Sequence, residues 1–188
     1  MAPVILASAS PRRKQLLEWA EVDFEIMVAD TDESYPAHYD PEAVAAHIAL
    51  HKALAVAERA GNSRPIIAAD TIVVLGGEVI GKPRDREDAI GILSRLSGKV
   101  HQVITGVSIQ YPAGAINFTD TTEVAFHELT AEQVAFYVDK YKPYDKAGAY
   151  AIQEWIGVVG IKNIKGDFYN VMGLPVSRVV QALASIGY

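Results

Sequence analysis

The chain has 188 residues, of which 50% are hydrophobic and 21% are charged, so it can form one sizeable α/β domain with an ordinary core. Its formal net charge of −6 argues against non-specific nucleic-acid binding and against a basic membrane-binding surface. The absence of cysteine excludes disulfides, thiolate metal sites and a cysteine nucleophile. The N-terminus has no signal-peptide pattern and no apolar run is long enough to span a membrane, so we expect a cytoplasmic protein.

The first half of the chain predicts βα units. A short apolar strand at 4–7 precedes Ser10 as a helix N-cap and Pro11 in the first helical position, and this helix should reach residue 20. Asp40-Pro41-Glu42 predicts a second helix that ends near residue 59. The further elements expected in this half are strands at 24–28, 65–69 and 72–75, a hairpin return at 78–80, and a helix at 86–96 capped by Asp85.

The second half predicts antiparallel pairing. Two long β-runs at 100–110 and 116–127 indicate a hairpin that forms the backbone of a mixed sheet. A capping-box pattern, Thr130 with Gln133, precedes a helix at 131–140. We expect another hairpin between 158–164 and 167–171, then a C-terminal helix from Pro175 to about Ser185. The predicted fold class is therefore α/β, a mixed β-sheet with flanking helices, and no linker or repeat divides the chain.

The segment 8–13 joins the first strand to the first helix, a geometry that offers backbone N–H groups to an anion. Arg12 and Arg13 occupy the first helical turn, where the helix dipole disfavours cations. A bound polyanion would remove this conflict, and a solvated pair of arginines is the alternative. Lys52 and Lys82 could help to neutralise a polyphosphate, although most lysines are simply exposed.

Asp70 lies between two apolar β-runs, where a carboxylate without a partner is costly to bury. This position favours a functional role, and Asp70 could accept a proton from an attacking water. Glu33 and Asp145 offer hard oxygen ligands that suit Mg²⁺ or Mn²⁺, with solvated loop acids as the alternative. The side chains that could stack on a nucleobase, but that more often pack in a core, are His101, Tyr150, Trp155 and Tyr169.

Eight motifs follow one another along the chain. They are Ser8-Ala9-Ser10-Pro11-Arg12-Arg13, Asp32-Glu33, Lys52-Ala53, Ala69-Asp70-Thr71, Gly81-Lys82-Pro83, Ser97–His101 with Thr105-Gly106, Asp145–Gln153, and Ile164–Val171 with Gly173-Leu174-Pro175. In this order and spacing they resemble the Maf family of nucleoside triphosphate pyrophosphatases over nearly the whole chain. One such motif would be weak support, but eight in order are highly specific.

The resemblance implies a single Maf-like domain over residues 1–188, in which two lobes surround a cleft as in inosine triphosphate pyrophosphatases. It implies a nucleotide diphosphatase activity that hydrolyses a nucleoside triphosphate to the monophosphate and pyrophosphate with a divalent metal cation, Mg²⁺ or Mn²⁺. The expected partner is thus a small nucleotide rather than nucleic acid or membrane, and a homodimer is expected from the family alone.

The resemblance also implies residue roles. Asp70 matches the family's proton acceptor. In the mechanism that we expect from these residues, Glu33 would hold the metal, together with Asp70 through water. The family's cluster around the phosphates falls on Ser8, Arg13, Glu33, Lys52 and Lys82. The positions that track substrate choice fall on Arg12, Thr71 and Gln153, and these residue types resemble the branch acting on dTTP and UTP rather than on 7-methyl-GTP.

Two other functions remain open from the sequence. The same reaction could remove modified or other non-canonical nucleotides, a house-cleaning role, or the chain could be a non-catalytic nucleotide-binding regulator of cell division and septum formation. The carboxylates and cations favour the enzyme, because a binding protein needs no water-activating Asp. One departure from the family is His47, where many relatives carry Arg, and it could make the support of the site pH-sensitive.

Overall fold

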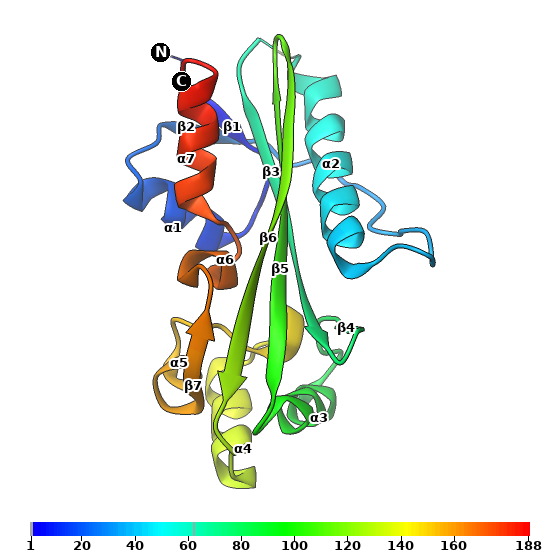
Figure 1. The fold of residues 1–188 in the computed structure, drawn as a ribbon, viewed down its shortest axis with the longest axis vertical. Coiled ribbons are helices and arrows are strands. Elements are labelled where there is room, and N and C mark those ends of the chain that lie inside the picture. The colour runs from blue at the N-terminus through cyan, green and yellow to red at the C-terminus, as the bar shows by residue number, and fades with distance from the viewer. Residues whose placement is uncertain (1, 62) are drawn as a thin grey trace. The chain divides into compact units, whose positions relative to one another are not determined.

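The computed structural model describes residues 2–61 and 63–188. The described strands are β1 (Val4–Leu6), β2 (Phe24–Ile26), β3 (Ile66–Leu75), β4 (Glu78–Ile80), β5 (Val100–Tyr111), β6 (Gly114–Phe126) and β7 (Ile161–Lys165). The described helices are α1 (Pro11–Trp19), α2 (Pro41–Ala60), α3 (Arg86–Leu96), α4 (Ala131–Tyr141), the 3₁₀ turn η1 (Ala147–Ala149), α5 (Trp155–Gly160), α6 (Phe168–Met172) and α7 (Val176–Ser185) (Figure 1). The strands hydrogen-bond in the order β2-β1-β3-β5-β6-β7, with β4 paired to β3, so the expected mixed α/β sheet is confirmed.

The chain divides into two compact units. Unit 1 contains the chain up to Thr71 together with Thr105–Asp120 and Gly173–Tyr188. Unit 2 contains Ile72–Ile104 and Thr121–Met172. The chain passes between the units within β3 and β6 and also at Ile104/Thr105 and Met172/Gly173, so neither unit is a continuous piece of sequence.

Unit 1 is built on a parallel three-stranded segment. β1 pairs in parallel with β2 on one side, where Leu6 is opposite Ile26, and with β3 on the other side, where Leu6 is opposite Ile67. The helix α1 connects β1 to β2, and α2 lies between β2 and β3 in sequence. The carboxyl ends of these parallel strands lie at the same edge. The connection from β1 to β2 and the next connection, from β2 to β3, run in opposite directions along the sheet, and open α/β sheets bind ligands at such a point.

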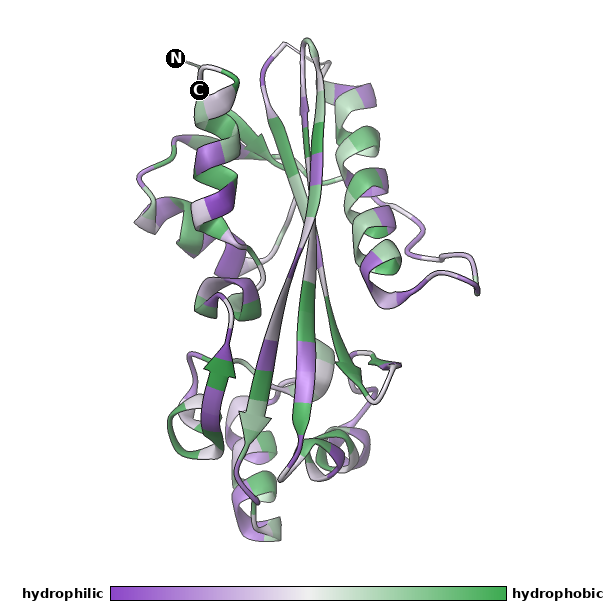
Figure 2. Cartoon of the chain, in the orientation of Figure 1, coloured by the Kyte–Doolittle hydropathy of each residue, from purple (hydrophilic) through white to green (hydrophobic). Residues whose placement is uncertain are grey.

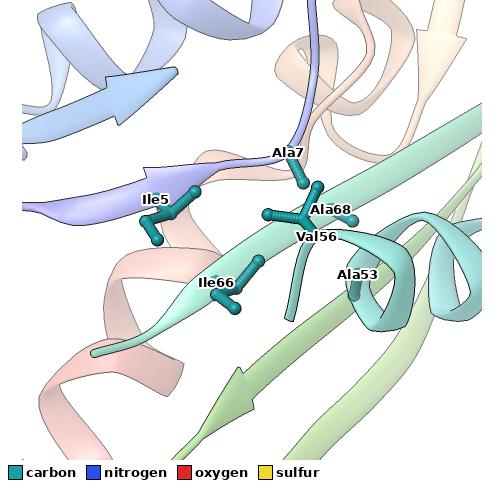
Figure 3. Packing of buried hydrophobic residues seen from close by; sticks show 6 residues of the cluster. All are labelled: Ile5, Ala7, Ala53, Val56, Ile66 and Ala68. Carbon is teal, nitrogen blue, oxygen red and sulfur yellow. The ribbon is translucent and has the colours of Figure 1, made fainter. Parts of the chain in front are cut away.

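The core of unit 1 joins α2 to this parallel segment. Alternate residues of β1 and β3, with Ala53 and Val56 of α2, form one buried cluster (Figure 3). Three of its six members are alanines, and small side chains let the helix backbone approach the strands closely. Figure 1 shows α1 and α7 on the other side of these strands, and Leu16 and Leu17 of α1 are completely buried. In Figure 2, β1 and β3 are mostly hydrophobic, whereas the loop leading into α2 is mostly hydrophilic.

The helix starts follow local sequence signals. Asp40 accepts a hydrogen bond from the Ala43 N–H at the start of α2, and Asp85 does the same for Asp88 at the start of α3. The capping box of Thr130 and Gln133 forms in full at the start of α4. α2 is the longest described helix, yet no helix among residues 2–61 and 63–188 is both long and apolar enough to cross a membrane.

The hairpin expected between 158–164 and 167–171 is wrong. Residues 155–160 form α5, 161–165 form β7, and 168–172 form α6. β7 pairs antiparallel with β6, so its partner is a strand distant in the sequence rather than the segment that follows it. Asp167 Oδ1 accepts the backbone N–H two residues later at 2.8 Å, which starts a helical turn, and Asn170 Nδ2 donates to Thr122 Oγ1 at 3.0 Å. These side-chain bonds favour helix over strand after residue 166.

Close packing of β5 on α2 gives a direct test of the fold of unit 1. A Cβ added at Gly106 would lie 2.3 Å from the carbonyl oxygen of Ala45 in α2, a distance that backbone atoms cannot accommodate without moving. We therefore expect Gly106→Ala to lower the free energy of unfolding by about 3 kcal/mol, measured by urea denaturation. The control is Gly91→Ala on the exposed side of α3, where an added Cβ meets nothing within 4 Å. It should raise the free energy of unfolding by about 0.5–1 kcal/mol, and equal stabilities for the two variants would contradict the packing described.

Candidate active site

The site lies at the carboxyl ends of the parallel strands of unit 1. The Ala7 N–H donates to the Ile67 carbonyl at 2.8 Å, so β1 ends level with this part of β3. The sequence predicted two short strands, with Asp70 at the end of the first. The structure has one strand, β3, and Asp70 lies in the middle of its ten residues. Beside it begin the turn of residues 8–10, after β1, and the loop that follows β2 and carries Glu33. The ends of β1 and β2 and the middle of β3 thus contribute the polar residues.

One ammonium group joins two carboxylates at this edge. Lys52 Nζ, from α2, lies 2.7 Å from Asp70 Oδ1 and 2.7 Å from Glu33 Oε1. The side chains of Lys52 and Asp70 are 19% and 15% exposed, whereas that of Glu33 is 52% exposed. Solvent therefore screens the Lys52–Asp70 attraction less than the attraction to Glu33. The cluster carries a net charge of −1 and presents hard carboxylate oxygens, which suit both a proton acceptor and a divalent cation.

Arg13 ties the start of α1 to distant parts of unit 1. Its Nε donates to the Gly173 carbonyl at 2.8 Å, Nη1 to Ser8 Oγ at 3.2 Å, and Nη2 to Thr71 Oγ1 at 3.1 Å. Burial lowers the pKa of the Arg13 guanidinium from its usual value, and the negative charge of Asp70 opposes that shift. Since a guanidinium has five N–H groups, at most two remain for a ligand. The charge and position suit a phosphate site, but much of the hydrogen bonding is structural.

The start of α1 has no side-chain cap. Ser10 occupies the N-cap position, as expected, but its side chain makes no capping hydrogen bond. Instead the Ser10 N–H donates to Ser8 Oγ at 3.2 Å, so the buried Ser8 hydroxyl organises the turn. No acidic residue lies in the first turn, which carries the half-buried Arg12. Backbone N–H groups and a cationic residue therefore occur in the same first helical turn, where phosphate is a favourable ligand.

Thr71 is engaged with the protein rather than exposed. Its Oγ1 lies 2.9 Å from Thr105 Oγ1 and 3.4 Å from the Gly173 carbonyl, in addition to accepting from Arg13. The sequence indicated a role for Thr71 but none for the buried Thr105 or for the carbonyl of Gly173. A glycine inside a predicted strand, as at Gly106, indicates a close approach of backbone. It was the one signal in the sequence that another segment packs closely on this part of β5.

The other predicted site residues belong to unit 2. Lys82 is exposed in the loop after β4, and Gln153 is exposed in the turn before α5. Asp145 is exposed, and its Oδ1 lies 2.8 Å from Lys146 Nζ. The structure thus brings together Ser8, Arg13 and Thr71, and separately Glu33, Lys52 and Asp70, all within unit 1. Lys82, Asp145 and Gln153 all belong to unit 2.

The aromatic candidates of unit 2 divide between core and surface. His101 and Tyr150 are buried, and His101 Nε2 lies 2.7 Å from Tyr150 Oη. Burial lowers the pKa of His101 to about 4 and raises that of Tyr150, so both are neutral near pH 7 and pack as core residues. Trp155 is half-buried and packs edge-on against Phe136, with ring centroids 4.8 Å apart. Tyr169 is 42% exposed.

His47 contacts two other rings beside the site, one tilted and one edge-on. Its ring centroid lies 4.1 Å from that of His51, one turn later on α2, and 5.5 Å from that of Tyr39. Lys52 follows His51 directly, so these ring contacts adjoin the turn of α2 that supplies the ammonium group. Within the described residues, no group of three or more His, Asp or Glu side chains could hold a metal ion by itself.

The Arg13 hydrogen bonds predict a large effect of a small change. Arg13→Lys keeps the positive charge but loses the fork that reaches three acceptors, so we expect the free energy of unfolding to fall by about 2 to 4 kcal/mol. Urea denaturation measures this difference. The control is Arg84→Lys in the exposed pair with Asp88, which should leave the unfolding midpoint unchanged. An unfolding midpoint of Arg13→Lys equal to that of the wild type would show that the three hydrogen bonds do not stabilise the fold.

Known proteins resemble this chain over nearly its whole length. The family model described as "Maf-like protein" matches residues 3–186. A protein named dTTP/UTP pyrophosphatase from Cytophaga hutchinsonii is 49% identical over 180 residues, which cover 96% of this chain and 82% of that protein. Another of that name from Parabacteroides distasonis is 48% identical over 181 residues, covering 96% and 94%. The solved Ham1 protein of Staphylococcus aureus has a TM-score of 0.54 at 17% identity and full coverage of both chains, which shows a shared fold. The chain therefore belongs to the Maf family, as the order of its motifs indicates.

Proposed function

We propose that this protein hydrolyses dTTP and UTP to the nucleoside monophosphate and pyrophosphate. The observation that carries the proposal is the pairing of Asp70 with Lys52 and Glu33 at the strand ends, beside an uncapped helix start. That pairing gives a water-activating carboxylate next to groups that bind phosphate. The relatives named dTTP/UTP pyrophosphatase, 43–49% identical over nearly the whole chain, support the choice of substrate.

The cations and amides of unit 1 would bind the triphosphate. The first turn of α1 supplies backbone N–H groups and carries Arg12, and Ser8 and Arg13 hold that turn in place. Lys52 supplies an ammonium at the strand ends. Because these groups are held before the substrate arrives, they can stabilise developing charge on phosphate oxygens without reorganisation.

Asp70 would act as the general base. Lys52 binds Oδ1, so Oδ2 is the oxygen that would receive a proton from water. The water oxygen forms a bond to the α-phosphorus, and the bond from that phosphorus to the bridging oxygen breaks, which releases pyrophosphate. The side chain is held from two directions, by the buried strand β3 and by the ammonium group, and this limits its freedom at the moment of proton transfer.

The donor set fits a divalent cation. Mg²⁺ is usually held by one or two carboxylates together with phosphate oxygens of the substrate, and Mn²⁺ accepts the same donors. Glu33 and Asp70 are such carboxylates, and the lack of a three-residue metal group in the described chain agrees with a site completed by the nucleotide. When bound, the cation would neutralise negative charge on the phosphates.

The assignments in unit 2 rest on the motif match. Lys82 is proposed to neutralise phosphate, and Gln153 to select the base. A uracil or thymine ring presents two carbonyls and one N–H, which an amide can match with its own donor and acceptor. Arg12 and Thr71 are proposed as the other two residues that set substrate choice, and Asp145 remains a further site candidate.

The role of Asp70 is tested by Asp70→Asn. The amide keeps the size and a hydrogen-bonding oxygen but cannot take up a proton from water, so we expect kcat to fall by about 10² to 10⁴-fold while the fold is kept. Pyrophosphate release from dTTP measures the rate. Asp23→Asn, the same change at an exposed position of unit 1, should keep the wild-type rate. Wild-type turnover by Asp70→Asn would remove Asp70 from the mechanism.

The reaction and its substrates are tested with a panel of nucleotides. Pyrophosphate release from dTTP, UTP, CTP, GTP, 7-methyl-GTP and ITP is measured with Mg²⁺, with Mn²⁺ and with EDTA. We expect release to be fastest for dTTP and UTP, to stop with EDTA and to return when the metal is restored. Release that favours another nucleotide keeps the reaction and overturns the substrate choice. Nucleotide binding without any release would support a regulator instead.

A further inference from the structure

We propose that Tyr137 and Glu154 are positioning residues for substrate selection, because together they hold the turn that carries Gln153. The inference rests on the proposed function, in which Gln153 reads the base. It concerns unit 2 alone, and the residues that carry it come from α4 and from the segment between η1 and α5.

Gln153 is an exposed side chain on an anchored turn. Its neighbours Ala151 and Ile152 are 4% and 5% exposed, so the backbone on one side is held in the core while the amide of Gln153 faces solvent. The Glu154 N–H donates to the Ala151 carbonyl at 3.1 Å, which closes the turn around Gln153. The conformation of this turn therefore decides where the amide is presented.

A single hydroxyl bonds to both sides of Gln153. Tyr137 is completely buried, and its Oη accepts the Ala151 N–H at 3.1 Å and donates to Glu154 Oε2. These partners lie two residues before and one residue after Gln153. Since a phenol has one proton to donate, and that proton goes to a carboxylate, the second bond is charge-assisted and strong. The phenol acts as a clamp on the turn.

The carboxylate of Glu154 has a second partner. Lys146 Nζ lies 3.8 Å from Glu154 Oε1 and 2.8 Å from Asp145 Oδ1. The side chains of Lys146 and Glu154 are 11% and 23% exposed, so solvent screens this attraction only in part. Lys146 thereby links the Asp145–Gln153 motif to the clamp, which gives these charged residues a role without contact to substrate.

Packing after the turn leaves little room for movement. A Cβ added at Gly157 would lie 1.7 Å from the carbonyl oxygen of Ile152, so the first turn of α5 sits directly against the backbone that precedes Gln153. Ile156, on the same helix, is 1% exposed. If the turn holds Gln153 in one position, its amide can distinguish bases by where their donors and acceptors lie. A mobile Gln153 would lose conformational entropy on binding, and this cost would weaken the discrimination.

The test is Tyr137→Phe, which removes the hydroxyl and keeps the ring. We expect the ratio of kcat/KM for dTTP to kcat/KM for CTP to fall about tenfold, as for loss of a hydrogen bond to a charged group, with KM for dTTP raised more than kcat is lowered. The control is Tyr144→Phe, the same change at an exposed tyrosine of unit 2, which should leave the ratio unchanged. If Tyr137 acts through Gln153, adding Tyr137→Phe to Gln153→Ala should change the ratio no further.

Hydrogen exchange provides a readout that does not depend on activity. The Ala151 amide should exchange faster with solvent in Tyr137→Phe than in the wild type, while amides of α3 stay protected. A selectivity ratio that stays at the wild-type value although Ala151 exchanges faster overturns the inference, as does a further loss of selectivity in the Gln153→Ala background. If Tyr137→Phe does not fold, Glu154→Ala is measured instead. We expect the same tenfold fall in the dTTP to CTP ratio of kcat/KM, and an unchanged ratio would contradict the inference. If the wild-type protein releases no pyrophosphate, that result contradicts the proposed function and not this inference.

Discussion

The ammonium of Lys52 is the group on which the site of unit 1 depends. It comes from α2 and binds carboxylates from β3 and from the loop after β2, so three parts of the chain meet at one charge. Asp70 in the middle of a buried strand would be costly without this partner, because a partly buried carboxylate loses much of its hydration. The attraction therefore offsets the cost of placing a reactive acid where the strand can hold it rigidly, and Glu33 is drawn to the same place.

A second set of polar contacts fixes the start of α1, as Lys52 fixes the Asp70 side chain of β3. The guanidinium of Arg13 fastens the helix start to Thr71 and to the Gly173 carbonyl, and the Ser8 hydroxyl completes the turn. The helix end is thereby held while its first N–H groups keep their capacity to bind an anion. In unit 2 the Tyr137 hydroxyl works in a similar way, since it accepts the Ala151 N–H before an exposed residue and donates to the Glu154 carboxylate after it. In each case a buried or partly buried polar group gives rigidity to a neighbouring part of the chain that is proposed to contact the ligand.

Local signals in the sequence were sufficient for most elements. Asp40-Pro41 and the Thr130–Gln133 capping box predict helix starts that the structure confirms, because a cap satisfies backbone groups within a few residues. The hairpin expected between 158–164 and 167–171 failed for the opposite reason. A short apolar run suits either a strand or a buried helical turn, and the choice was made by pairing of β7 with β6, which lies about 40 residues away in the sequence.

The sequence by itself determined the fold class, the family and the types of residue at the site, since composition, periodicity and motif order are properties of the chain. It could not determine which of those residues touch. Arg13 and Gly173 are 160 positions apart, and the sharing of Lys52 between two carboxylates depends on how α2 packs against β1 and β3. Nor could it reveal that Ser8 rather than Ser10 organises the helix start. Such contacts were decided by tertiary structure, because hydrogen bonds and ion pairs need atoms within a few ångströms, and only the packed core brings distant segments that close.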